Sequence, residues 1–78
     1  MNGNQIAKAA EALLVGRRIV GVRFLTDEEQ RSLYWFRKAP VIELDDGNFL
    51  FPSADDEGND AGALFTSFEQ LLTIPVLR

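Results

Sequence analysis

The fold is decided by the stretch Val41-Ile42-Glu43-Leu44-Asp45-Asp46-Gly47-Asn48-Phe49-Leu50-Phe51-Pro52. Two apolar runs flank Asp46-Gly47, a dipeptide that favours a two-residue turn with positive φ, so the stretch predicts a β-hairpin. Pairing about that turn sets Leu44 opposite Phe49 on one face. Ile42 and Phe51 are expected to pair on the same face, which predicts that this face belongs to the core.

A helix and a strand are predicted before the hairpin. After Asn4, a candidate N-cap, apolar residues recur at helical spacing as far as residue 14, and Gly16 predicts the end of the helix. Residues 17–25 are rich in β-branched and aromatic side chains, which is typical of a strand. Gly21 inside this strand indicates a bulge or a close contact with another backbone.

Three further signals complete the set of elements. Thr26 and Glu29 have the spacing of a capping box, which predicts a short helix to about residue 33. Pro52 has no amide hydrogen to donate and is expected to end the hairpin ladder. Residues 63–66 and 74–77 have the composition of short strands, the second of them at a sheet edge.

These elements predict an α+β fold in a single domain spanning residues 1–78. We expect an N-terminal helix packed on a small antiparallel sheet of about four strands. The alternative is a small, partly open β-barrel with the helix capping one end.

The composition excludes several kinds of chemistry. The chain has no Cys and no His, so thiolate nucleophiles, disulfides, zinc sites built on sulfur and imidazole bases are ruled out. The lack of disulfides, with an N-terminus that does not have the pattern of a secretory signal, predicts a cytoplasmic protein. No uncharged stretch approaches the roughly 20 residues of a membrane helix, so no membrane association is expected.

Charge is distributed unevenly between the two halves of the chain. Residues 1–39 carry seven basic and four acidic residues, a net +3, whereas residues 40–78 carry one and eight, a net −7. The halves either complement each other within the fold or steer a partner or a second copy. The overall charge of −4 disfavours nucleic acid as a partner.

An acidic segment at residues 53–62 is the densest cluster of potential metal ligands, namely Asp55, Asp56, Glu57, Asn59 and Asp60. Oxygen ligands of this kind suit Ca²⁺ or Mn²⁺. The EF-hand spacing fails, because Leu64 stands where that motif requires a bidentate Glu. The same residue types build ordinary turns, so the segment is either a structural loop or a cation site, and no other cofactor is expected.

Residues 31–38 interleave three aromatic side chains with three cations. If Tyr34, Trp35 and Phe36 alternate sides, at least one large aromatic points away from the core. Because exposed aromatics near arginine are enriched in protein interfaces, we predict a homodimer interface at Tyr34, Trp35, Phe36 and Arg37. Stacking on single-stranded nucleic acid is the alternative, which the acidic composition disfavours.

Three segments carry a resemblance to known sequences: Val15-Gly16-Arg17-Arg18-Ile19-Val20-Gly21-Val22-Arg23-Phe24-Leu25-Thr26, Leu44-Asp45-Asp46-Gly47, and the run from Pro52 to Thr66. Over roughly residues 13–77 the chain resembles a family of short, uncharacterised bacterial proteins. The family has no assigned activity, cofactor or partner. The resemblance implies a free-standing bacterial protein whose acidic loop belongs to the shared pattern.

The function expected from the sequence is a non-catalytic binding or assembly module that self-associates and that has a polar loop free for a further protein partner. A divalent-cation-binding module using the 55–60 loop is the first alternative. A small hydrolase using the same carboxylates is the second.

Overall fold

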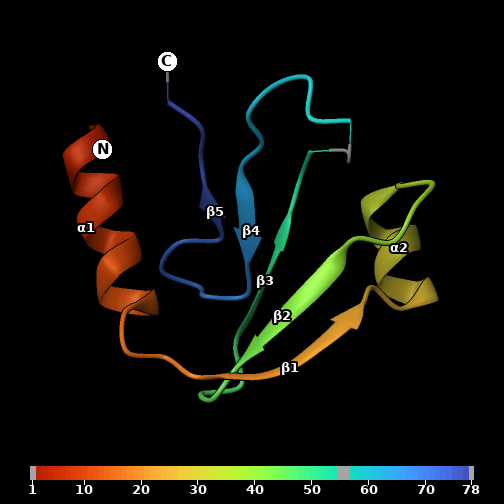
Figure 1. Ribbon diagram of the computed structural model, residues 1–78, viewed down its shortest axis with the longest axis horizontal. Coiled ribbons are helices and arrows are strands. Elements are labelled where there is room, and N and C mark those ends of the chain that lie inside the picture. Colours follow the sequence, from red (N-terminus) through yellow and green to blue (C-terminus); the bar gives the residue numbers. More distant parts are fainter. Residues whose placement is uncertain (1, 55–56, 78) are drawn as a thin grey trace.

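The computed structural model describes residues 2–54 and 57–77. In chain order its elements are α1 (Gly3–Leu14), β1 (Ile19–Phe24), α2 (Asp27–Leu33), β2 (Pro40–Leu44), β3 (Phe49–Pro52), β4 (Leu64–Thr66) and β5 (Thr73–Ile74). The five strands form one antiparallel sheet in the order β1-β2-β3-β4-β5 (Figure 1). The predicted α+β fold is confirmed, with one strand more than expected. Within the described ranges β1 and β5 do not pair with each other, so the sheet is open and the β-barrel alternative is wrong.

The β2–β3 hairpin forms, but its register differs from the prediction by one residue. Phe49 pairs with Glu43 rather than with Leu44. Phe51 is displaced in the same way from its expected partner, Ile42. Because successive side chains of a strand point to opposite faces, this shift puts Phe49 and Phe51 on the face of Val41 and Glu43, and leaves Ile42 and Leu44 on the other face. The core face therefore contains Phe51, as predicted, but takes Val41 rather than Ile42 from β2.

The turn between β2 and β3 explains the shift. The Gly47 N–H donates to the Leu44 C=O (3.2 Å), and the Leu44 N–H donates to the Asn48 C=O (2.8 Å). Gly47 has a φ of +86°, whereas Asp46 has no positive φ. The connection is therefore a type I turn followed by a left-handed glycine, which takes three residues instead of the predicted two. The Asp46 Oδ1 accepts the Asn48 N–H (3.0 Å) and stabilises this turn.

Both helices begin with a capping box. In α2 the Thr26 hydroxyl accepts the Glu29 N–H (3.1 Å), as predicted. In α1 the N-cap is Asn2 and not Asn4, because Asn2 Oδ1 accepts the Gln5 N–H (2.9 Å) and Gln5 Oε1 accepts the Asn2 N–H (2.8 Å). The residue three positions after Asn4 is an alanine, which has no side-chain acceptor for this reciprocal arrangement.

Strand β1 contains the irregularity that Gly21 indicated. The register between β1 and β2 shifts between Ile19 and Gly21, which is the pattern of a β-bulge. A β-carbon on Gly21 would lie 2.6 Å from Oε1 of Glu43. Gly21 therefore lies at a bulge and also makes a close contact. The contact is with the side chain of Glu43, whereas the sequence indicated another backbone.

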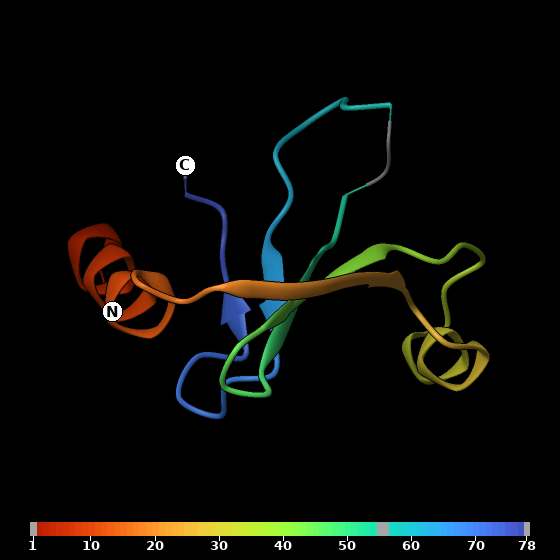
Figure 2. The same ribbon diagram turned by 60° about the horizontal axis from the view of Figure 1, so that its bottom comes forward.

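The core cluster lies on one face of the sheet, whereas Leu44, which is also buried, belongs to the other face. Leu25, Val41 and Phe51 form the core cluster, and Leu33 of α2 and Trp35 pack against it. α2 lies at the β1 end of the sheet, whereas α1 lies beyond β5, beside the C-terminal segment (Figures 1 and 2). The helix packed against the core cluster is thus α2 rather than the N-terminal helix.

The predicted apolar stripe of α1 (Ile6, Ala9, Ala10, Leu13 and Leu14) is half-buried. A β-carbon on Gly3 would lie 3.0 Å from Leu77 Cδ1, which places the start of α1 against the C-terminal segment. Neither helix in the described part of the chain has the length and apolar character needed to cross a membrane.

Candidate functional site

The aromatic segment after α2 turns two of its three rings outward. Tyr34 is 91% exposed and Phe36 is 99% exposed. Trp35 points inward, with its ring centroid 6.0 Å from that of Phe51 and 6.1 Å from that of Phe65. The prediction that at least one aromatic faces away from the core is confirmed. Of the predicted interface residues, Trp35 is half-buried against the core and contributes mainly to the fold.

Tyr34 has an unusual backbone conformation. It is the C-cap of α2 and has a φ of 60° and a ψ of 32°, which is left-handed. This conformation is strained for a residue with a β-carbon and is normally given to glycine or asparagine at the end of a helix. A ring that is almost fully exposed recovers none of this cost through burial. Folding alone therefore does not account for a tyrosine at this position.

An open depression of about 950 Å³ lies beside these aromatics. The floor of the depression includes a row of apolar residues at the ends of four neighbouring strands. In this row Phe24 of β1 pairs with Pro40 of β2, and Pro52 of β3 pairs with Leu64 of β4. Residues 34–39 line one side, and residues at both ends of the loop between β3 and β4 line the other. The fold thus brings the aromatic segment and part of the acidic loop, which are separate in the sequence, to one concave surface.

The charged residues of this depression lie on opposite sides of it. Arg37 and Lys38 come from the aromatic segment, and Glu57 comes from the acidic loop. Lys38 Nζ forms an ion pair with Asp27 Oδ1 in the first turn of α2. Arg37 is exposed at the predicted interface.

The acidic loop does not form a metal cluster among the residues that the structure describes. Asp55 and Asp56 lie outside the described residues. Glu57, Asn59 and Asp60 are exposed. Asn59 Nδ2 donates to Glu57 Oε2 (3.3 Å), and the Ala61 N–H donates to Asp60 Oδ1 (2.7 Å). Over residues 2–54 and 57–77 no group of three His, Cys, Asp or Glu side chains is placed to hold an ion.

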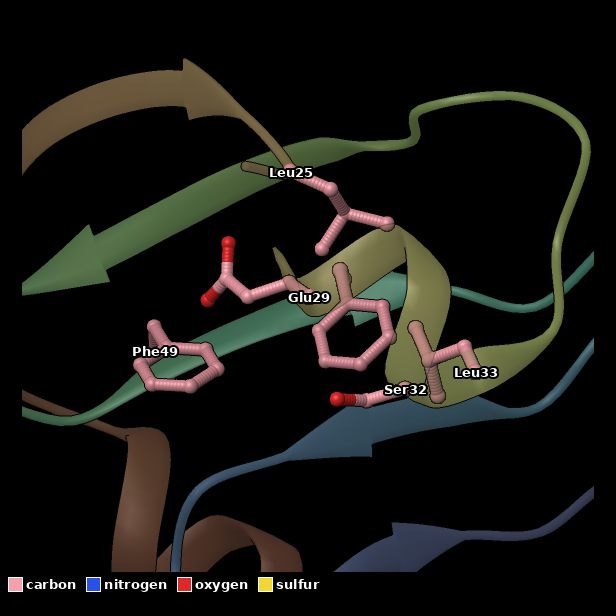
Figure 3. A pocket seen from close by; sticks show the side chains of 6 residues that line it. Leu25, Glu29, Ser32, Leu33 and Phe49 are labelled. Atoms are coloured by element: carbon pink, nitrogen blue, oxygen red, sulfur yellow. The ribbon is translucent and has the colours of Figure 1, made fainter. Parts of the chain in front are cut away.

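A smaller pocket of about 190 Å³ lies between α2 and the sheet and contains a carboxylate and a hydroxyl, those of Glu29 and Ser32 (Figure 3). The Arg23 guanidinium donates to both Glu29 oxygens, and the Thr26 N–H donates to one of them. The bonds to Arg23, followed by those to Thr26, lower the pKa of Glu29 from 4.5 to about 2. Ser32 Oγ donates to the Glu28 C=O (3.1 Å). Glu29 is therefore a weak base at neutral pH, and the Ser32 hydroxyl has a structural partner.

In the β2–β3 turn the Asp46 carboxylate and the Asp45 backbone also have structural partners. Asp46 accepts the Asn48 N–H and lies 3.4 Å from Arg17 Nε. The bond from Asn48 is the main cause of the lowered pKa of Asp46. The Asp45 N–H donates to the Arg18 C=O (2.9 Å). These contacts stabilise the turn and the neighbouring end of β1.

One surface was not singled out as a site by the sequence analysis. Ile19, Val20, Val22 and Phe24 of β1 are all more than 60% exposed, and we call them the β1 surface. Their apolar character was visible in the sequence and predicted a strand. The pattern of a strand does not say whether that strand lies at the centre or at the edge of its sheet, so their exposure could not be foreseen.

Comparison of the chain with protein-family models, with curated proteins and with solved structures gives no match. The comparisons therefore add nothing to the family resemblance suggested by the sequence.

Proposed function

We propose that the protein is a non-catalytic assembly module that self-associates and that presents its open depression to a further protein partner. The observation that carries this proposal is the amount of apolar surface left uncovered. The large exposed side chains include four on β1 and two, Tyr34 and Phe36, on the aromatic segment. Of these side chains, Phe24, Tyr34 and Phe36 gather around the depression, and exposed apolar surface that gathers in one place marks interaction sites.

The size of the exposed surface supports the same proposal. The chain exposes 5988 Å², whereas a compact monomer of 8.7 kDa exposes about 4,700 Å². Its radius of gyration is 13.0 Å, against about 11.5 Å for a compact chain of this length. The difference in area, about 1,300 Å², exceeds the roughly 800 Å² that each partner buries in a standard interface. Covering the exposed apolar side chains with a second copy would bring the chain closer to an ordinary compact protein.

The exposed tyrosine supports a binding role for the depression. Tyr34 keeps a left-handed backbone while its ring is 91% exposed. Backbone strain that burial does not offset is often found at binding sites. Aromatic rings beside an arginine also match the composition of interaction hot spots. We propose that Tyr34, Phe36 and Arg37 contact the partner, and that the protein acts in the cytoplasm.

A catalytic role is not part of the proposal. The carboxylate in the smaller pocket, that of Glu29, is held ionised by Arg23, and both Glu29 oxygens accept hydrogen bonds. A general base near neutral pH needs a pKa closer to 7. The cation-binding alternative has no observation among the described residues that favours it over self-association.

Light scattering coupled to size-exclusion chromatography, run from about 1 to 300 µM, tests the proposal. We expect the average mass to rise with concentration from that of one chain, 8.7 kDa, toward that of two. A mass of 8.7 kDa at every concentration would contradict self-association.

A further inference from the structure

We infer that the outer edge of β1 pairs with β1 of a second copy, in antiparallel register centred on Val22, to form one continuous ten-stranded sheet. This inference rests on the proposed self-association and specifies the surface that mediates it. β1 is an edge strand, since it pairs with β2 on one side. On its other side, no element of the described chain lies along it in either view (Figures 1 and 2).

The hydrogen-bond pattern shows which backbone groups face outward. The Leu25 N–H donates to the Ala39 C=O (3.0 Å), so these two residues form a hydrogen-bonded pair of the β1–β2 ladder. Such pairs recur every second residue in an antiparallel ladder. Arg23 and Gly21 therefore direct their backbone groups toward β2, and Val22 directs its N–H and C=O toward the open edge. An open edge with an apolar side chain at its centre is a template for adding a strand.

The register centred on Val22 is favoured by the residues on both sides of it. It sets Val22 against Val22 of the second copy and Val20 against Phe24. All of these side chains belong to the β1 surface and are exposed in the single chain. On the other face it sets Arg23 beside Gly21 of the second copy, which has no side chain of its own and lies against the Glu43 carboxylate. Shifting the strands by two residues would instead oppose two Arg23 side chains or two Gly21 residues.

Charge makes the edge complementary to itself. Arg17 and Arg18 precede β1, and Asp27 and Glu28 follow it at the start of α2. Because the strands of the pair run in opposite directions, the basic end of each lies beside the acidic end of the other. The bulge separates Arg18 from Val22, so Arg18 is brought near the start of α2 of the second copy, where Glu28 lies, without being held in the ladder register. Over residues 2–54 and 57–77 neither Arg18 nor Glu28 forms an ion pair within the chain.

The bulge at Ile19 and Gly21 limits the length of the pairing. A bulge increases the local twist and disrupts regular pairing beyond it. Pairing is therefore confined to the few residues around Val22. An interface of this length fits a dimer that dissociates on dilution. The aromatic rings of Tyr34 and Phe36 lie outside the strand pair and stay available to a different partner.

The substitution that tests the pairing is Val22→Lys, with Val15→Lys as its matched control. Val22 is 68% exposed and Val15 is 75% exposed, but Val15 lies in the turn after α1, outside β1. A lysine at the centre of the pair puts two like charges on the two-fold axis. We expect the dissociation constant from sedimentation equilibrium to rise about tenfold or more for Val22→Lys and by less than about twofold for Val15→Lys.

Cross-linking tests the register without relying on loss of association. The chain has no cysteine, so Val22→Cys places one thiol in each copy. Opposite residues of a hydrogen-bonded pair have Cα atoms about 5.5 Å apart, within the range that a disulfide spans. Mild oxidation at a concentration where the dimer predominates should yield a covalent dimer from Val22→Cys and little from Val15→Cys. This result decides the matter if Val22→Lys does not fold.

A charge exchange tests the orientation of the two strands. Arg18→Glu and Glu28→Arg should each weaken the dimer about fivefold, because each contact occurs twice. Combining the two substitutions should restore most of the affinity, since the pair is then reversed rather than removed. Parallel pairing, or contact through another surface, would not give this rescue.

The outcomes separate the inference from the proposed function. If the wild-type chain stays monomeric, both are overturned. If it dimerises, but Tyr34→Ser/Phe36→Ser dissociates the dimer while Val22→Lys and Val22→Cys behave like their Val15 controls, self-association stands and the β1 pairing is overturned. Dissociation by Val22→Lys together with cross-linking through Val22→Cys supports the pairing.

Discussion

Arg23 of β1 and Glu29 of α2 are joined by two hydrogen bonds, from Nη1 to Oε1 (2.8 Å) and from Nη2 to Oε2 (3.2 Å). Arg23 Nε also lies 3.3 Å from Glu43 Oε2 on β2, and its guanidinium carbon lies 5.7 Å from the centre of the Phe49 ring. One side chain thus connects the edge strand, its neighbour and the capping box of α2. Two-point arginine–carboxylate pairs have a fixed geometry, so this contact orients α2 against the sheet.

The Arg23–Glu29 pair predicts how stability depends on pH. Glu29 has a pKa of about 2 in the folded chain, against an ordinary pKa of 4.5 for a glutamate side chain. Between these values the unfolded chain binds more protons, so the contribution of Glu29 is complete above about pH 5 and is lost as the pH falls toward 2. We expect this contribution to be about 1–2 kcal/mol, because the side chains are 31% and 30% exposed and water screens the pair.

Glu29→Gln tests that prediction, with Glu28→Gln, its neighbour in the first turn of α2, as control. Urea unfolding followed by circular dichroism at pH 7 and pH 3 gives the free energy of unfolding of each variant. Glu29→Gln should lose about 1–2 kcal/mol at pH 7 and roughly two fifths of that at pH 3, where the folded chain still holds Glu29 mostly ionised. Equal losses at both pH values would show that the ionised pair does not carry the effect.

The inward orientation of Trp35 predicts that truncating it lowers the free energy of unfolding, whereas truncating its neighbour Phe36 hardly changes it. Trp35→Ala removes contacts with Phe51 and Phe65 and should lower the free energy of unfolding by about 2–3 kcal/mol. Phe36→Ala removes a ring that is 99% exposed and should change it by less than about 0.5 kcal/mol. Urea unfolding followed by circular dichroism, at a concentration where the chain is monomeric, measures both. Similar losses for the two variants would contradict the orientations described.

The three-residue turn predicts a cost for any β-carbon at Gly47. Its φ is +86°, and an added β-carbon would meet nothing within 4 Å, so the cost is conformational and not steric crowding by neighbours. Gly47→Ala should lower the free energy of unfolding by about 1 kcal/mol. Gly47→Asn should lower it by less, because asparagine tolerates left-handed φ better than alanine. An alanine variant as stable as the wild type would indicate that the turn can adopt another form.

Local signals in the sequence were sufficient for the elements but not for every register. The capping box at Thr26 and Glu29 involves residues three positions apart, so it could be identified from the sequence alone. The dipeptide Asp46-Gly47 correctly located a turn, yet it is compatible with loops of two or three residues. Choosing between them depends on which faces of β2 and β3 are buried, and that is set by α2 and Trp35 from elsewhere in the chain.

For the candidate sites, too, local sequence patterns predicted some features, whereas others depend on contacts between distant parts of the chain. Alternation along Tyr34, Trp35 and Phe36 predicted that a ring faces outward, but not which one, because the inward ring is chosen by contact with Phe51 and Phe65. The meeting of this segment with the acidic loop depends on the pairing of β2, β3 and β4, which no local pattern reveals. The exposure of Val22 depends on the place of β1 at the sheet edge. Sequence patterns therefore identified the side chains of the site better than the surface that they form.

The left-handed backbone of Tyr34 predicts a substitution that stabilises the fold while it removes an exposed ring. Tyr34→Gly should raise the free energy of unfolding by about 1 kcal/mol, because glycine adopts a φ of 60° without the strain caused by a β-carbon. Tyr34→Ala removes the same ring but keeps the β-carbon, so it should leave the free energy of unfolding within about 0.5 kcal/mol of the wild-type value. Thermal and urea unfolding of the monomeric chain measure this difference. If glycine is no more stabilising than alanine, the C-cap is not strained, and backbone strain gives no reason to assign Tyr34 a role in binding.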